Sequence, residues 1–171
     1  MNVKRTAIVA LGGLVVLAAV RARSQPAASR DQILGTWRAE TLKVTSGGET
    51  TYPLGEHPSG FVTITSERMW LLFVDPARKA PASAALTDAE AAAMMRSQVA
   101  WTGRYTVGEQ APEGVRITAH VDAASSQAIV GNDRPYFVRV DGDKITFKSP
   151  GVVVPMTGKT SVVEFQMTRS Q

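Results

Sequence analysis

The sequence has no cysteine among its 171 residues. This absence excludes disulfides, thiolate zinc sites, iron–sulfur clusters and cysteine nucleophiles together. Stability must therefore come from an apolar core alone. The composition can supply one, because 44% of the residues are hydrophobic and 20% are charged, as in ordinary globular domains. The length fits a single core, since domains commonly run about 100–200 residues.

A basic patch of the kind that binds nucleic acid is also missing. The formal net charge is +4, but four of the 19 basic residues lie within the first 24 positions, which contain no acid. The remaining 15 basic residues balance the 15 acidic ones. No run of Lys or Arg follows Arg23, whereas a nucleic-acid-binding domain carries its basic patch on the folded part. We therefore predict no nucleic-acid partner.

Several patterns of catalysis and cofactor binding are absent as well. The sequence has no Gly-x-Ser-x-Gly elbow, no glycine-rich phosphate loop and no convincing pair of catalytic carboxylates. Its two histidines, His57 and His120, lie far apart and lack the spacing of metal ligands. We predict neither a metal nor a cofactor, and we leave open whether the protein is an enzyme.

Residues 1–24 have the pattern of an export signal. Lys4 and Arg5 precede an apolar stretch that runs to Val20, and small residues at Ala22 and Ser24 favour cleavage after residue 24. The alternative is an uncleaved membrane anchor, although the apolar stretch is shorter than the ~20 residues of a spanning helix. With either outcome we expect the folded part to be periplasmic or secreted.

After a predicted linker at residues 25–31, the domain at residues 32–171 alternates apolar and polar side chains with period two, as half-buried strands do. The predicted strands are residues 37–45, 49–52, 61–65, 69–74, 101–107, 115–121, 136–140, 144–148 and 161–169. One helix interrupts them, because Thr87 and Glu90 form a capping box and good helix formers continue to Ala100. Short antiparallel strands favour a sandwich or a barrel, and a barrel of about eight strands has room for one small ligand.

Motifs along the domain resemble the bacterial and fungal lipocalin-like domain family, whose fold is a calycin-type barrel. The motifs occur in the same order as in the family and extend over residues 33–169. In chain order, they are residues 33–38, which contain Gly35-Thr36-Trp37, then residues 52–60, Arg68-Met69, residues 100–107, His120-Val121, Gly131 and Asp141-Gly142-Asp143. Two positions depart from the family: Ala119 stands where a second His is common, and Ser66-Glu67 replaces an Asp-Gly turn. The resemblance implies an all-β, antiparallel lipocalin-like barrel of about eight to nine strands with one inserted α-helix.

The resemblance also assigns two residues to closure of the barrel. In lipocalins an Arg near the last strand packs over the signature Trp, which here places Arg169 over Trp37. The face of an indole attracts a guanidinium, and the site is partly shielded from water. We predict a structural role for this pair, not a catalytic one.

Aromatic residues on the strands are the candidates for a ligand site. Aromatic rings around a concavity, together with a few polar groups, are typical of small-molecule sites. Gly103 shares its strand face with two of these residues and is expected to leave space beside them for a guest. We expect some of the four candidates to face a cavity; they are Trp70, Trp101, Tyr105 and Tyr136.

His120 is the candidate for acid–base chemistry. Its strand carries apolar residues on one face and polar residues on the other, so His120 and Asp122 share the polar face. If that face points inward, His120 can act as a general base near neutral pH, with Asp122 orienting the imidazole. If it points outward, as the polar face of an alternating strand usually does, both residues are solvated.

Three functions stay open at this point. The first is an exported lipocalin-like protein that binds a small, mostly apolar molecule inside the barrel. The second is an isomerase or cyclase on the same scaffold that acts on an apolar metabolite, with His120 as the acid/base. The third is a barrel that is filled by its own side chains and has a structural or interaction role. The volume and lining of the interior decide among them.

Overall fold

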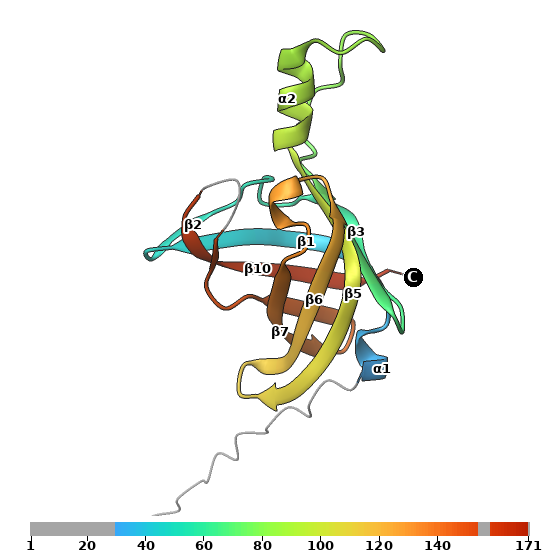
Figure 1. Cartoon of the computed structure of the whole chain (residues 1–171), viewed down its shortest axis with the longest axis vertical. Helices are drawn as coiled ribbons and strands as arrows, with labels where there is room; N and C mark the ends of the chain where they lie inside the picture. The colour runs from blue at the N-terminus through green and yellow to red at the C-terminus, as the bar shows by residue number, and fades with distance from the viewer. Residues whose placement is uncertain (1–29, 154–157, 171) are drawn as a thin grey trace, which may run out of the picture.

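Eight antiparallel strands close into a barrel in the computed structural model, which describes residues 30–153 and 158–170 (Figure 1). The barrel strands are β1 (Gly35–Ser46), β3 (Ser59–Ile64), β4 (Arg68–Val74), β5 (Gln98–Ala111), β6 (Gly114–Ala124), β7 (Asp133–Asp141), β8 (Lys144–Lys148) and β10 (Thr160–Arg169). The shorter elements are α1 (Arg30–Ile33), β2 (Glu49–Thr51), α2 (Asp88–Arg96), η1 (Gln127–Ile129) and β9 (Val152–Val153). The predicted antiparallel barrel with an inserted helix is confirmed.

The barrel closes because β1 pairs with one strand on each side. Strands β3 to β8 each pair with their neighbour in the chain, and β10 lies between β8 and β1. Gly35 at the start of β1 is the partner of Ile64 on β3, while Trp37 is the partner of Arg169 on β10. Full closure satisfies the backbone hydrogen-bonding groups that an open sheet leaves exposed at its edges.

The alternation of the sequence sorts side chains between the inside and the outside of the barrel. On β6, Val115, Ile117, Ala119 and Val121 are buried, while the residues between them are more exposed. Successive side chains of a strand point to opposite faces. Each of the eight barrel strands therefore contributes alternating residues to one shared apolar core.

One end of the barrel is covered by α1. The indole Nε1 of Trp37 donates a hydrogen bond to the carbonyl of Ile33 at 2.9 Å. The guanidinium of Arg169 donates to the carbonyls of Leu34 and Gln32 at 3.0 and 2.9 Å. Trp37 is fully buried, and the guanidinium lies over its ring. These contacts hold α1 across the foot of the barrel.

Helix α2 projects from the opposite end (Figure 1). The hydroxyl of Thr87 accepts from the N–H of Glu90 at 3.3 Å, and the Glu90 carboxylate accepts from the N–H of Thr87 at 2.9 Å, so the predicted capping box is present. The helix ends at Arg96 and does not reach Ala100. Residues from Gln98 onward pair with β4, and strand pairing overrides helix propensity there.

The predicted leader at residues 1–24 lies outside the described residues, so its role stays a prediction. The short helix α1 begins at Arg30, within the predicted linker. Within residues 30–153 and 158–170, no helix has both the length and the hydropathy needed to cross a membrane.

Candidate functional site

A cavity of about 270 Å³ lies inside the barrel, and its lining includes the end of α2 and the segment around η1. It therefore opens at the end from which α2 projects, opposite α1; Figure 1 shows the positions of these two helices. Strands β1, β5, β7 and β10 form its walls, while the end of α2 and the segment around η1 form its rim. Most of its surface is apolar, and its lining residues are Leu42, Val44, Met95, Arg96, Gln98, Val99, Trp101, Ser125, Ser126, Ile129, Arg134, Tyr136, Val163 and Phe165. It is slightly smaller than the pockets of about 300–1,000 Å³ that hold drug-sized ligands, so a small guest fits best.

Aromatic rings form the inner wall of this cavity. Trp101 and Tyr136 have ring planes within 4° of parallel and centroids 6.5 Å apart. Phe165 lies beside Tyr136 with a centroid separation of 5.7 Å. On the side away from the opening, Phe147 packs edge-on against Tyr136 at 5.7 Å and fixes the ring. The sequence therefore brings two of its four aromatic candidates, Trp101 and Tyr136, to one rigid apolar surface.

Tyr136 is also the most deeply buried titratable group of the cavity. Burial raises the pKa of its hydroxyl above the ordinary value of 10.0, and the nearby positive charge of the Arg134 guanidinium opposes that shift. The hydroxyl is thus a neutral hydrogen-bonding group at physiological pH. Arg134 is half-buried and stands two residues away on the same strand face.

The other two aromatic candidates lie elsewhere. Tyr105 is inside the barrel, but its hydroxyl donates to the carbonyl of Thr65 at 2.7 Å, and it does not line the cavity. Trp70 is on the outer wall with 42% of its surface exposed, because it alternates with the buried Met69 and Leu71 on β4. Both faces of β4 are apolar, so alternation alone did not reveal which face is inside.

Gly103 does not provide space for a guest. A Cβ atom at this position would lie 2.1 Å from the carbonyl oxygen of His120 and 3.0 Å from the Cα of Val121. The glycine stands beside a register shift between Thr102 and Gly103, where β5 and β6 approach closely. Its role is to permit this backbone contact, which corrects the expectation drawn from strand parity.

His120 is on the outer wall of the barrel. Its side chain is 42% exposed, and the residues on either side of it, Ala119 and Val121, are the ones that face the core. The imidazole Nδ1 lies 2.6 Å from a carboxylate oxygen of Asp133, and Nε2 lies 3.3 Å from the hydroxyl of Thr106. The polar face of β6 therefore points to solvent, and the imidazole does not reach the cavity.

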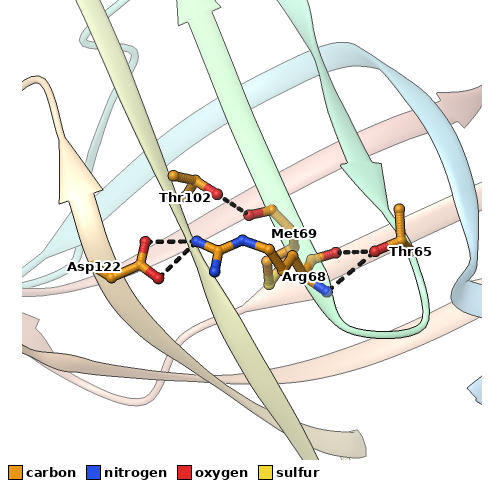
Figure 2. A network of polar contacts seen from close by, with 5 residues as sticks. All are labelled: Thr65, Arg68, Met69, Thr102 and Asp122. Atoms are coloured by element: carbon orange, nitrogen blue, oxygen red, sulfur yellow. Dashed lines mark hydrogen bonds and ion pairs between the residues drawn. The ribbon is translucent and has the colours of Figure 1, made fainter.

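Asp122 has a different partner from the one expected. Its two carboxylate oxygens accept from the Arg68 guanidinium at 2.7 and 2.6 Å (Figure 2). The Arg68 side chain crosses the outer face of β5 to reach β6, and its backbone N–H is held by the Thr65 hydroxyl at 3.1 Å. Thus Asp122 links β6 to β4 across β5 and does not orient the imidazole of His120.

Three further hollows, of about 600, 530 and 500 Å³, lie outside the barrel, and the third of them lies over exposed apolar side chains that include Phe61, Trp70 and Leu72. The first lies over charged side chains of the outer wall, among them Arg38, Glu40 and Arg139. The second lies between α2 and the preceding loop around Pro81. In the part of the chain that the structure describes, no cluster of three or more His, Asp or Glu residues is placed to hold a metal ion. The cavity inside the barrel is therefore the candidate site.

Comparison with known families agrees with this geometry. The lipocalin-like domain family matches residues 34–170, which is nearly the whole of the barrel. This chain belongs to the lipocalin-like domain family. No match was found among curated proteins or among solved structures.

Several residues of the site in this lipocalin-like domain were not predicted from the sequence. Met95 and Arg96 reach the rim because α2 ends above the opening, and Ile129 is buried there by the turn η1. Arg134 had one usable signal, because it precedes Tyr136 by two residues and so shares its face. A charged residue on an inward face is unusual and marks a site for closer study.

Proposed function

We propose that this lipocalin-like domain binds a small, mostly apolar molecule in the cavity between Trp101, Tyr136 and Phe165. The observation that carries this proposal is the cavity itself, which is about 270 Å³ in volume, mainly apolar and bordered by residues of the buried core. Removing apolar ligand surface from water provides the driving force, at roughly 25 cal/mol per Å² before the costs of ordering. Lipocalin-like proteins generally bind small hydrophobic ligands, which supports the same interpretation.

The position of the rings favours binding over a filled, purely structural barrel. Trp101 is 5% exposed and Tyr136 is 2% exposed, yet both rings border open volume. Phe147, which does not line the cavity, and Phe165, which does, both pack against Tyr136, so the wall is rigid before a guest arrives. A preorganised wall lowers the entropic cost of binding.

The experiment is calorimetric titration with octanol, combined with the shift in Tm that octanol causes. We expect saturable binding to one site, which Val163→Phe weakens at least tenfold because the larger ring fills the cavity. Val162→Phe is the matched control, since Val162 alternates with Val163 on β10 and faces outward. Native mass spectrometry of protein purified from its host adds an independent readout. Absence of a retained molecule, together with no binding of octanol or octanoate, contradicts the proposal.

We also propose that the domain acts outside the cytoplasm. The support is the sequence of residues 1–24, with its basic start, apolar run and small residues before Gln25. Expression of the full chain in a bacterial host, followed by fractionation and N-terminal sequencing, tests this. Periplasmic or extracellular protein that begins at Gln25 supports a cleaved signal, and membrane-bound protein with an intact leader supports an anchor. Full-length protein in the cytoplasm overturns the proposal.

A further inference from the structure

The charged side chains of the cavity are of one sign. Arg96 at the end of α2 and Arg134 at the start of β7 both belong to the lining, whereas none of the 14 lining residues is Asp or Glu. Arg134 is the strand partner of the fully buried Ala119, which places it on the inward face of the barrel wall. An apolar cavity with a cationic rim is selective for the head group of its ligand.

No acid of the described residues neutralises these arginines. Among the residues that the structure describes, neither Arg96 nor Arg134 takes part in an ion pair. The acid next to Arg134 in the chain, Asp133, points outward and is engaged by His120 at 2.6 Å. A guanidinium that is half-buried without an acid is poorly compensated, and an anionic group supplied by a ligand corrects this.

Tyr136 adds a second polar group at the same place. Tyr136 is 2% exposed and lies near the Arg134 guanidinium, and its hydroxyl stays protonated at physiological pH because burial raises its pKa. The serine hydroxyl of Ser125 is already used by the backbone of Ala100, at 3.1 and 3.3 Å. Arg96, Gln98 and Ser126 also belong to the lining, but Arg134 and Tyr136 share the inward face of β7 and so offer two polar groups together to a polar head.

We propose that the ligand is an apolar molecule with a single carboxylate, whose head is bound by Arg134 and Tyr136 and whose body packs on Trp101 and Phe165. This inference rests on the proposed function and specifies its ligand class. The planar guanidinium matches the two oxygens of a carboxylate, and Arg96 at the exposed rim contributes attraction during entry. The small volume of the cavity favours one short chain or a compact ring system as the body.

The experiment compares octanoate, octanol and octylamine, which share one body and differ in the charge of the head. At neutral pH we expect octanoate to bind at least about tenfold more tightly than octanol, as a charge-assisted hydrogen bond implies. Octylamine is expected to bind most weakly. Equal affinity for octanoate and octanol overturns this inference but leaves the proposed function standing, whereas no binding of either contradicts the proposed function.

Variants locate the selectivity. Arg134→Met is expected to reduce the affinity for octanoate to that for octanol, with octanol binding changed less than about twofold. Arg116→Met is the matched control, because Arg116 is exposed on the outer face of β6 and is expected to change neither affinity. If Arg134→Met does not fold, Arg134→Lys retains the charge without the planar fork and is expected to lose part of the preference. An undiminished preference for octanoate in Arg134→Met, or in Arg134→Lys if only that variant folds, overturns the assignment.

Discussion

The guanidinium carbon of Arg169 lies 4.0 Å from the centroid of the Trp37 ring. This stacked pair joins the last strand to the first, at the register where the barrel closes. The same guanidinium also donates to two carbonyls of the chain around α1, those of Gln32 and Leu34. One side chain therefore fastens the foot of the barrel in two ways, through a ring face and through backbone acceptors.

Replacing Arg169 by Lys tests this arrangement. Lysine keeps the charge but lacks the planar fork, so it cannot stack on Trp37 and reach both carbonyls. We expect the free energy of unfolding to fall by about 1–3 kcal/mol, as measured by urea denaturation. Arg104→Lys, at an exposed position of β5, is the control and is expected to change little. Equal stability of the two variants would show that the planar guanidinium of Arg169 does not stabilise the closed end of the barrel.

Gly103→Ala tests the close approach of β5 and β6. The added Cβ would lie 2.1 Å from the carbonyl oxygen of His120, so the backbone must move apart. We expect a loss of roughly 1–3 kcal/mol in the free energy of unfolding, the typical range for overpacking of a rigid interior. Gly108→Ala on the same strand is the control, because the nearest atom there is 3.6 Å away. A folded Gly103→Ala protein with unchanged Tm contradicts the steric explanation.

The fold could be predicted from the sequence more fully than the site. Alternation and tight turns follow local rules, so the strands and the capping box at Thr87 were found from neighbouring residues alone. The inner and outer faces of β4 could not be told apart, because Trp70 and Leu71 are both apolar. Arg134 was missed because the predicted strand began at Tyr136, whereas β7 begins at Asp133 and pairs Arg134 with the buried Ala119 of β6.

The outer-wall position of His120 predicts the effect of removing it. His120→Ala deletes the contacts with Asp133 and Thr106 but touches nothing in the cavity. We expect ligand binding to change by less than about twofold and stability to change by about 1 kcal/mol or less, as is typical of exposed ion pairs. Calorimetry with octanol measures the first quantity and urea denaturation the second. A large loss of binding, or of any turnover of an apolar metabolite, would restore the acid/base hypothesis for this histidine.

Acid is expected to loosen the start of α2 selectively. Hydrogen bonds from the backbone N–H groups of Ala82 and Thr87, and then from the Thr87 hydroxyl, lower the pKa of Glu90 from 4.5. The stability that this carboxylate contributes is therefore present above about pH 4.5 and is lost as the pH falls through the lower, folded-state pKa. As the pH is lowered from neutral, residues 88–96 should lose their protection against amide hydrogen exchange before the barrel strands do. Glu90→Gln keeps the capping geometry without titrating, so its exchange should lack this acid step.

Alkali is expected to destabilise the barrel through Tyr136. Burial raises the pKa of this hydroxyl in the folded protein, while the unfolded chain releases the proton near the ordinary value of 10.0. The folded state therefore holds the proton more tightly, and the associated stability is complete below pH 10.0 and declines as the pH rises above it. Tyr136→Phe should flatten this decline in the urea midpoint, whereas Tyr52→Phe, at a site 41% exposed, should leave it unchanged. If the urea midpoint declines equally at alkaline pH in the unsubstituted protein and in both variants, the Tyr136 hydroxyl titrates as freely in the barrel as in the unfolded chain. The hydroxyl would then be too accessible to water to serve as the fixed donor of an enclosed site.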